Sequence, residues 1–352
     1  MTFLNEQEEM HFSGIVYIRD RQDSKLTQRG TIRLLDGRII GGYPTIKRAY
    51  NLENAIKKEF GDKKFYVEEK LDGTNIRIAF LQDEIFAFTR GGYICPYTTE
   101  LLNEYQNIKE LLENYQNFLL CGELIGNNPY NNASIMYGEQ PRIKIFDLFE
   151  ITHGNINLVP LDKRNELLDQ YNIELVPVYG IKTIKEYEEI RKILIELNNR
   201  KREGVVLKAI KTLTPRIKYS TMASNALAII DFIKKGFEPS SPSPRNRMYH
   251  LGCFLHEIKQ YDFENVSNFL GKAFIKPLLD SIESGEVTEK YKIKISSQGW
   301  EELLKRMKKY IRIRIDKTTY ISESKIEVNF TKIFPASTDQ LRDFMNGQTY
   351  AD

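Results

Sequence analysis

Polar and hydrophobic residues alternate along several short segments of the chain. A period of two residues places successive side chains on opposite faces of a β-strand, so these segments predict strands with one buried face. Turns that contain glycine, proline or aspartate separate many of them. The predicted strands cover residues 14–19, 30–35, 64–70, 75–81, 85–90, 118–126, 142–150, 175–180, 203–210, 311–315 and 325–330.

Other segments place hydrophobic residues every three to four positions, which is the period of an amphipathic α-helix. The apolar helix predicted at residues 222–236 is expected to end at Gly236, because glycine is frequent just after helix C-termini. Together with the strands, these helices predict an α+β fold. The predicted helices cover residues 45–61, 98–116, 162–172, 183–200, 222–236 and 297–310.

The composition is that of an ordinary globular protein, with 352 residues, of which 41% are hydrophobic and 28% are charged. The formal net charge is only +3, so a nucleic-acid surface would have to be a local basic patch. No apolar run approaches the roughly 20 residues of a membrane span, and the N-terminus has no signal-peptide pattern. The three cysteines and four histidines show no zinc-ligand spacing. We therefore expect a cytoplasmic protein without a membrane segment.

The segment "YVEEKLDGTNIRI" places Lys70 between two predicted strands, two residues before the Asp72-Gly73 turn signal. A lysine amine is a poor nucleophile while it is protonated, and it becomes a good one where its pKa is lowered. Gly73 would allow the backbone to approach a ligand closely. On these residues alone, a solvated hairpin lysine is at least as good an interpretation as a catalytic one.

Further candidate residues follow in order along the chain. Arg90 precedes two glycines, which suits phosphate binding. Glu123 ends an apolar strand, where an unpaired carboxylate would be costly. Phe146 lies in a strand from which it could stack on a base, although a core position is the ordinary fate of such a residue.

The region 203–218 adds charged residues around two predicted strands. Glu203 precedes an apolar strand and Lys208 follows it. Arg216 and Lys218 are two positions apart, so both would lie on one face of a strand and could bind one anion. The alternative for Arg216 and Lys218 is a solvated strand edge. A nucleotide site is favoured only by the combination of all the candidate residues from Lys70 to Lys218.

This ordered set resembles the covalent nucleotidyltransferases, which comprise ATP-dependent DNA and RNA ligases and mRNA-capping guanylyltransferases. The resemblance covers roughly residues 64–220 and implies a core of ATP-grasp-like antiparallel sheets with flanking helices. Six short segments carry it, matching motifs I, Ia, III, IIIa, IV and V: "KLDG", "TRGG", "GEL", "IFDLF", "EGVVLK" and "RIK".

The resemblance also implies a role for each matching residue. Lys70 would receive AMP as a lysyl-phosphoramidate, and Glu68 would face the adenine amino group. Phe146 would stack on the adenine, while Arg90 and Glu123 would contact the ribose or the incoming strand.

Metal and phosphate ligands are implied as well. Glu203 and Glu123 would hold Mg²⁺ (or Mn²⁺), which is the usual partner of ATP in such sites. The phosphates of ATP would be bound by Lys208, Arg216 and Lys218.

Within this superfamily the chain looks most similar to the archaeal-type homodimeric ATP-dependent RNA ligases. Asn75, assigned to the nucleotide site, stands where DNA ligases and capping enzymes usually carry arginine, and the segment "RIIGGYPTIKRAYNL" also fits this branch. Arg216 departs from the usual lysine of its motif. The expected layout is an N-terminal module, an adenylyltransferase domain, a helical dimerisation region and a small C-terminal domain, at residues 1–60, 61–236, 237–300 and 301–352. The Pro/Ser-rich segment 237–247 marks the main boundary.

The implied reaction is ATP-dependent joining of a 5′-phosphate and a 3′-hydroxyl of RNA through lysyl-AMP and RNA-adenylate. The basic segment 305–317 is a candidate RNA-binding patch in which Arg312 and Arg314 share a strand face. A solvated helix and a charged edge strand explain that segment equally well.

Three alternatives remain open from the sequence. The same core could serve a DNA ligase or a capping guanylyltransferase. The chain could instead be a nucleotide- or RNA-binding protein without turnover, although the lysine and the key acids are present. Least favoured is an unrelated α+β binding module in which the motifs occur by chance.

Overall fold

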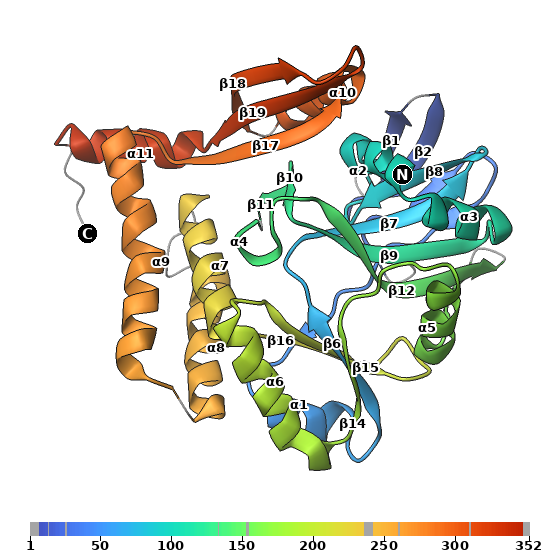
Figure 1. Ribbon diagram of the computed structural model, residues 1–352, viewed down its shortest axis with the longest axis horizontal. Coiled ribbons are helices and arrows are strands. Elements are labelled where there is room, and N and C mark those ends of the chain that lie inside the picture. The colour runs from blue at the N-terminus through green and yellow to red at the C-terminus, as the bar shows by residue number, and fades with distance from the viewer. Residues whose placement is uncertain are drawn as a thin grey trace. The chain divides into compact units, whose positions relative to one another are not determined.

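The computed structural model describes residues 7–12, 14–24, 27–132, 134–152, 155–235, 242–259, 261–309 and 311–347, and its elements are labelled in Figure 1. The chain forms two compact units. Unit 1 comprises Met1–Lys47, Leu71–Val178 and Lys208–Arg216, and unit 2 comprises Arg48–Lys70, Tyr179–Leu207 and Ile217–Asp352. Each unit therefore combines segments that are distant in sequence. The four-domain division predicted above stays a prediction.

A five-stranded antiparallel sheet forms the centre of unit 1. The alternating patterns predicted four of these five strands to within about two residues at each end, because each of the four has buried apolar residues on at least one face. The short strand β13 was not predicted. In sheet order the strands are β13 (Asn155–Leu158), β12 (Arg142–Thr152), β9 (Phe118–Ile125), β7 (Thr74–Leu81) and β8 (Glu84–Thr89).

A second antiparallel sheet, β1 (Gln7–Phe12), β2 (Ile15–Asp20), β3 (Ile32–Leu34) and β4 (Ile39–Ile40), packs on the central sheet of unit 1. The two sheets share one hydrophobic core, which includes Tyr17 and Phe88 in edge-to-face contact at 6.2 Å between ring centroids. Arg77 of β7 is fully buried, and its guanidinium donates to the carbonyl oxygens of Gly30 and Gly41. These bonds tie the N-terminal sheet to the central one.

The helical region predicted at 98–116 is divided into shorter helices. They are α2 (Pro96–Leu101), a 3₁₀ turn η1 (Leu102–Glu104) and α3 (Gln106–Asn114), and Tyr105 between them has a non-helical backbone. Cys95 caps α2 by accepting a hydrogen bond from the Thr98 backbone nitrogen. Unit 1 also contains α5 (Leu161–Gln170), the short α4 (Ser134–Tyr137) and the small strands β10 (Asn127–Asn128) and β11 (Asn131–Asn132).

The first sheet of unit 2 has the order β14 (Val178–Lys182), β6 (Phe65–Lys70), β15 (Gly204–Ala209), β16 (Arg216–Ser220) and β5 (Lys47–Arg48). A few residues at the strand ends belong to unit 1: Lys47, Val178, Lys208, Ala209 and Arg216. Lys70 is the last residue of β6, and β7 begins only four residues later in the other sheet. The strands around Lys70 therefore do not pair with each other. The interpretation of Lys70 as a hairpin residue is wrong for this reason.

Helix α1 (Leu52–Glu59) is shorter than the helix predicted at 45–61. Its N-cap is Asn51, whose side chain accepts from the backbone nitrogen of Asn54. The residues before it are extended, since β5 joins the sheet and the Ala49 nitrogen donates to the Lys218 carbonyl at 3.0 Å. The helical period of this segment was overridden by strand pairing.

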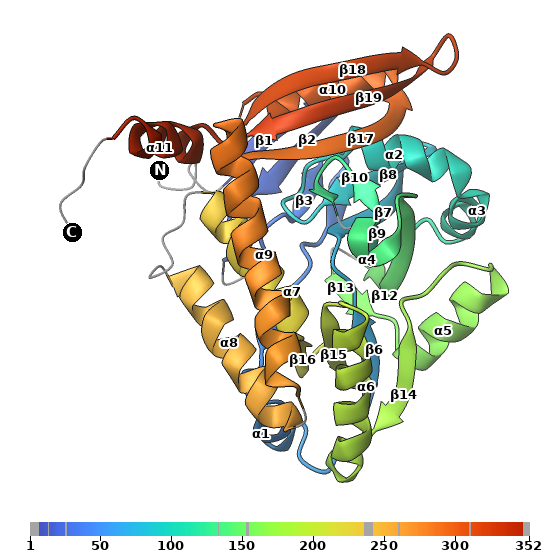
Figure 2. The ribbon, with the colours of Figure 1, turned by 60° about the vertical axis from the view of Figure 1, so that its left-hand side comes forward.

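Three long helices of unit 2 lie beside one another in Figures 1 and 2: α7 (Met222–Lys234), α8 (Pro242–Ile258) and α9 (Phe263–Ser284). Residues 242–247 of the predicted linker 237–247 form the start of α8. Residues 237–241 and Gly236 lie outside the described residues. Helix α6 (Tyr187–Asn199), preceded by the turn η2 (Ile184–Glu186), packs on α7.

The last part of unit 2 is a three-stranded antiparallel sheet with the order β17 (Thr288–Ser296), β19 (Lys325–Ile333) and β18 (Arg312–Tyr320). Helix α10 (Ser297–Met307) covers one of its faces, and α11 (Pro335–Met345) follows it. Among the residues that the structure describes, no helix combines the length and the apolar character that crossing a membrane requires.

The Glu257 carboxylate of α8 holds several elements of unit 2 together. It accepts hydrogen bonds from the backbone nitrogens of Leu52 and Glu53 at the start of α1. It also accepts from the hydroxyl groups of Tyr219, at 2.6 Å, and Tyr187. A carboxylate at a helix N-terminus is favoured by the helix dipole as well as by these bonds.

We expect Glu257→Ala to lower the free energy of unfolding by roughly 2–4 kcal/mol, because several buried donors would lose their acceptor. Glu166→Ala, which removes an exposed carboxylate from α5, should stay within about 0.5 kcal/mol of the parent. Urea denaturation of the three proteins measures both effects. Equal unfolding midpoints would show that Glu257 does not stabilise the fold.

Candidate active site

Lys70 and Glu203 form an ion pair in the first sheet of unit 2. The Lys70 Nζ atom donates to Glu203 Oε2 at 2.6 Å. Their strands are neighbours in the sheet, with Lys70 ending β6 and Glu203 immediately preceding β15. The lysine side chain is 21% exposed and the carboxylate only 7%, so a ligand can reach the amine while its partner stays mostly buried.

The two acids before Lys70 point to opposite faces of β6. Glu68 is two positions away, so it shares a face with Lys70, and it is almost completely buried. Glu69 lies on the other face, where it accepts from the Tyr179 hydroxyl at 3.0 Å and lies 3.9 Å from Arg202. Burial, followed by the nearby Glu69 charge, raises the pKa of Tyr179. Glu68 is therefore the acid of this strand that accompanies Lys70.

A buried carboxylate, Asp147, organises the candidate residues of unit 1. It is fully buried, and its oxygens accept from Lys208 Nζ at 3.2 Å and from the Arg216 guanidinium. The Tyr43 hydroxyl donates to the same carboxylate at 2.6 Å, and Arg164 lies 4.0 Å away. Two residues predicted to bind phosphates thus bind a carboxylate inside the protein.

Burial alone would raise the pKa of Asp147, but the positive charges of Lys208 and Arg216 outweigh it and hold the pKa far below its usual range. The carboxylate is therefore ionised at neutral pH, and it compensates the charge of both cations. For a nucleotide phosphate to bind either cation, it would have to compete with Asp147. Lys218, in unit 2, is only half-buried.

Phe146 occupies a β-bulge where the pairing of β12 with β9 shifts register between Ile145 and Asp147. A bulge turns a side chain away from the regular alternation of the strand. The half-buried Phe146 ring lies edge-on to Tyr43 at 5.2 Å between centroids, and Lys208 Nζ is 5.3 Å from its centre. The ring thus packs against the Asp147 cluster.

Asn75 and Glu123 are directly opposite each other on β7 and β9. The Asn75 Oδ1 atom is buried and accepts no hydrogen bond from the described residues. A buried acceptor of this kind suits a donor of a bound nucleotide. Gly73 approaches the neighbouring strand closely, since an added Cβ would lie 2.4 Å from the Leu124 carbonyl oxygen. The glycine after Lys70 is therefore needed for packing on β9.

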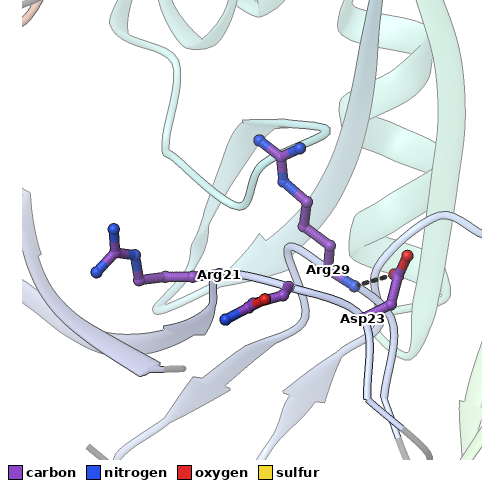
Figure 3. Close-up of a pocket in the computed structure, with 4 residues that line it drawn as sticks. Arg21, Asp23 and Arg29 are labelled. Carbon is purple, nitrogen blue, oxygen red and sulfur yellow. Dashed lines mark hydrogen bonds between the residues drawn. The ribbon is translucent and has the colours of Figure 1, made fainter. Parts of the chain in front are cut away.

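The turn that carries Arg90 packs on the turn between β2 and β3. A Cβ added at Gly30 would lie 2.1 Å from the Arg90 carbonyl oxygen, and Arg19 donates to the Gly91 carbonyl at 2.9 Å. The exposed Arg90 side chain donates to Thr45 at 3.2 Å. The same β2–β3 turn bears a surface pocket, shown in Figure 3, lined by Arg21, Gln22, Asp23 and Arg29.

The proposed metal ligands lie in different units, Glu203 in unit 2 and Glu123 in unit 1. Within the described residues, no group of three or more His, Cys, Asp and Glu side chains is placed to hold a metal ion. Each glutamate offers a hard oxygen donor, and Mg²⁺ commonly combines one or two such carboxylates with phosphate oxygens and water. The chemistry of both residues fits that ion.

Arg312 and Arg314 are both exposed on the same face of β18, as predicted. Arg314 donates to Glu286 at 2.6 Å and to Asp316 at 3.3 Å. Its charge is therefore partly compensated within the C-terminal sheet.

Sequence reasoning missed Asp147, Tyr43 and Arg164. Asp147 had a signal, because a single acid inside the apolar strand "IKIFDLF" needs buried partners. Its hydrogen-bond partners Tyr43, Lys208 and Arg216 lie about 60 to 100 residues away along the chain, and no local pattern identifies them.

Family models match two regions of the chain. Residues 63–220 match the model described as RNA ligase, and residues 246–348 match the C-terminal region of ligase Pab1020. The chain is 32% identical over 346 residues to the uncharacterized protein MJ0414 of Methanocaldococcus jannaschii, with 93% of this chain and 87% of that protein covered.

Solved structures agree with these matches. An archaeal ATP-dependent RNA ligase (form 1) is 26% identical, with a TM-score of 0.86 and coverage of 99% of this chain and 94% of that chain. A candidate ATP-dependent DNA ligase from Aquifex aeolicus is 28% identical, with a TM-score of 0.89 and coverage of 98% and 97%. The chain has the fold of the ATP-dependent ligases in the nucleotidyltransferase superfamily. It belongs to the RNA ligase family.

We expect Asp147→Asn to cost roughly 3–5 kcal/mol of unfolding free energy at pH 7, because Lys208 and Arg216 would remain buried without compensation. The folded pKa of Asp147 lies below its unfolded value of about 3.9. Its contribution is therefore present above that pH and is lost as the pH falls towards the folded pKa.

Denaturation at pH 7 and at steps between pH 5 and 3 measures both effects. The parent should lose more stability than Asp147→Asn over this acid range. Asp169→Asn, an exposed substitution in α5, serves as the control and should follow the parent. Identical acid profiles for the parent and Asp147→Asn would contradict the assignment.

Proposed function

We propose that this enzyme joins a 5′-phosphate and a 3′-hydroxyl of RNA in the cytoplasm, with Lys70 as the residue that carries AMP. The observation that supports this most strongly is the position of Lys70. It ends β6, is reachable from solvent, shares a strand face with Glu68 and is held by Glu203 at 2.6 Å. A solvated lysine would not need two buried carboxylates beside it.

In the first step, Lys70 Nζ attacks the α-phosphorus of ATP. A phosphorus–nitrogen bond forms, the α–β phosphoanhydride bond breaks, and pyrophosphate leaves. The attacking amine must first lose a proton, because an ammonium has no free electron pair. The ion pair with Glu203 holds the amine in position, and its release for attack requires Glu203 to engage another positive charge. A divalent ion, Mg²⁺ or Mn²⁺, would supply that positive charge and neutralise the phosphates.

In the second step, AMP moves from Lys70 to the 5′-phosphate of RNA, which forms a 5′–5′ phosphoanhydride. In the third step, the 3′-hydroxyl attacks that 5′-phosphate, and AMP leaves as the phosphodiester bond forms. Both steps require alignment and charge neutralisation more than acid–base groups.

The remaining residues bind the nucleotide in this proposal. Glu68 reads the adenine amino group, and the bulged Phe146 supports the base. Asn75 uses its buried Oδ1 atom to accept from the nucleotide, which its lack of an acceptor bond within the described residues supports. Arg90 and Glu123 contact the ribose or the incoming strand.

Phosphate contacts are proposed for Lys208, Arg216 and Lys218. In this structure Lys208 and Arg216 bind Asp147. We therefore propose that they also hold β15 and β16 in place. Lys218 is the more exposed of the three and is the best placed to follow a phosphate.

Incubation with ATP labelled at the α-phosphate and Mg²⁺ should give a labelled protein–AMP adduct with the parent and none with Lys70→Ala, because the substitution removes the attacking nitrogen. Lys64→Ala removes an exposed lysine just before β6 and should form the adduct normally. An adduct of undiminished yield on Lys70→Ala would remove Lys70 from this role.

The acceptor is tested by adding a 5′-phosphorylated single-stranded RNA to the adduct, with nicked duplex DNA in a parallel reaction. Circular or extended RNA supports the proposal. Sealing of the DNA alone would favour the DNA-ligase alternative, which the Aquifex relative represents. An adduct formed with GTP instead of ATP would favour capping.

We further propose that the enzyme is a homodimer that pairs through α9. None of the residues of this helix is buried, although Ile275, Leu278, Leu279 and Ile282 form an apolar stripe at helical spacing. These four side chains are between 42% and 57% exposed. An exposed stripe of this kind is typical of an interface.

Leu278→Glu combined with Leu279→Glu should convert the dimer to a monomer, since two charges would be buried in an apolar contact. The molar mass from light scattering after size exclusion measures this. Lys276→Glu changes the charge of a side chain on the same helix that is 75% exposed and should leave the dimer intact. A monomeric parent at tens of micromolar protein would rule the proposal out.

A further inference from the structure

The C-terminal sheet has one apolar face and one cationic face. Along β17, Tyr291, Ile293 and Ile295 are buried, while the alternate residues Lys290, Lys292 and Lys294 are exposed. We call these three residues the lysine row. Because successive side chains of a strand point to opposite faces, the lysine row lies on a single face.

The cationic face continues across the sheet. Lys292 is opposite Asn329 of β19, and Asn329 is opposite Lys317 of β18. Lys290 is likewise aligned through Thr331 with Arg314. Residues directly opposite in an antiparallel pair share a face, so the lysine row, Lys317 and Arg314 are all on it. Arg312 occupies the same face one alternation earlier in β18.

The other face of the sheet is covered within unit 2. Phe330 of β19 contacts Trp300 of α10 and stacks on Tyr291, each at 5.2 Å between ring centroids. The hydrophobic core that holds the C-terminal sheet together therefore uses mainly this face, although Thr331 and Ile333 of the opposite face are also buried at the end of β19.

Some acids on or near the cationic face pair with its cations. Glu286 and Asp316 both bind Arg314. Glu327 of β19 is 3.2 Å from Lys292, while the other central residues of β19 on this face, Asn329 and Thr331, are neutral. On this face basic side chains therefore outnumber acidic ones among the described residues, in a chain whose formal net charge is only +3.

Protection of the sheet edges is the competing explanation, because β17 and β18 are both edge strands and lysine is a common guard of such edges. That role requires only a few charges, and it does not require them to have one sign. Residues two apart on a strand are about 6.8 Å apart, so the cations of the lysine row repel one another. An ordered polyanion on this face would relieve that repulsion.

We infer that the lysine row, with Lys317, binds the phosphodiester backbone of the RNA that the enzyme joins. This inference rests on the proposed function. The spacing along β17 is on the order of the distance between successive phosphates of an extended strand. The side chains on this part of the face are Lys, Asn, Thr and Glu rather than aromatic groups, so they contact the backbone and not the bases. Binding is therefore independent of sequence and weakens with salt.

The test replaces Lys290, Lys292 and Lys294 together with glutamine and measures the Kd for a 5′-phosphorylated single-stranded RNA between 50 and 200 mM salt. Each lost phosphate contact lowers the slope of log K against log salt by about 0.7, so the slope should fall by about 2. We expect roughly tenfold weaker binding at the lowest salt. Two RNAs of different sequence should be affected alike.

Two matched variants accompany it. The first replaces the exposed lysines Lys58, Lys63 and Lys64 with glutamine, which makes the same charge change in α1 and in the segment before β6. This variant should keep the Kd of the parent. Arginine at the three positions of the lysine row keeps the charge and should also preserve it. Thermal melting confirms that each variant is folded.

If K290Q/K292Q/K294Q kept the Kd and the salt slope of the parent, the inference would be wrong. The same holds if this variant keeps its RNA affinity but loses self-association, which would make the face a protein contact. Failure of the proposed function is distinguished by the adduct assay, which needs ATP but no RNA. The glutamine variant should form protein–AMP as the parent does, and a parent without adduct would refute the proposed function whatever the Kd values are.

Discussion

A carboxylate without contact to water stays ionised only if cations are held against it, and Asp147 imposes this constraint on unit 1. Its partners fix the geometry around it. Lys208 is near the end of β15, Arg216 begins β16, and Tyr43 follows the N-terminal sheet. One buried charge thus ties together strands that carry three of the family's motifs. The same cluster holds the bulged strand from which Phe146 projects.

Lys70 illustrates how the order of strands positions a side chain. The chain leaves one sheet at Lys70 and enters another four residues later. A strand end leaves the amine at the edge of regular structure, where it is accessible, while the neighbouring strand supplies Glu203. Gly73 permits the sharp transition, because any side chain there would meet the backbone of β9. In the proposed reaction, the ion pair positions the amine, and the first step requires Glu203 to release it.

The five longer strands between residues 64 and 152, β6 to β9 and β12, could be predicted from the sequence because each has buried apolar residues in a local pattern. The family was also identifiable, since its motifs are short and keep their order. Contacts between distant segments could not be predicted. The helical period of residues 45–50 gave way to pairing with β16, and the internal partner of Lys208 and Arg216 depends on a strand about 60 residues away. The cationic face of the C-terminal sheet likewise requires the register of three strands.

The central claim is that Lys70 carries AMP. Peptide mapping by mass spectrometry, after incubation of the unmodified protein with ATP and Mg²⁺, tests it most directly because it locates the modified residue without a substitution. The account predicts one modified peptide, with the mass of AMP on Lys70. An AMP group on another residue, with an unmodified Lys70 peptide in the same digest, would contradict it.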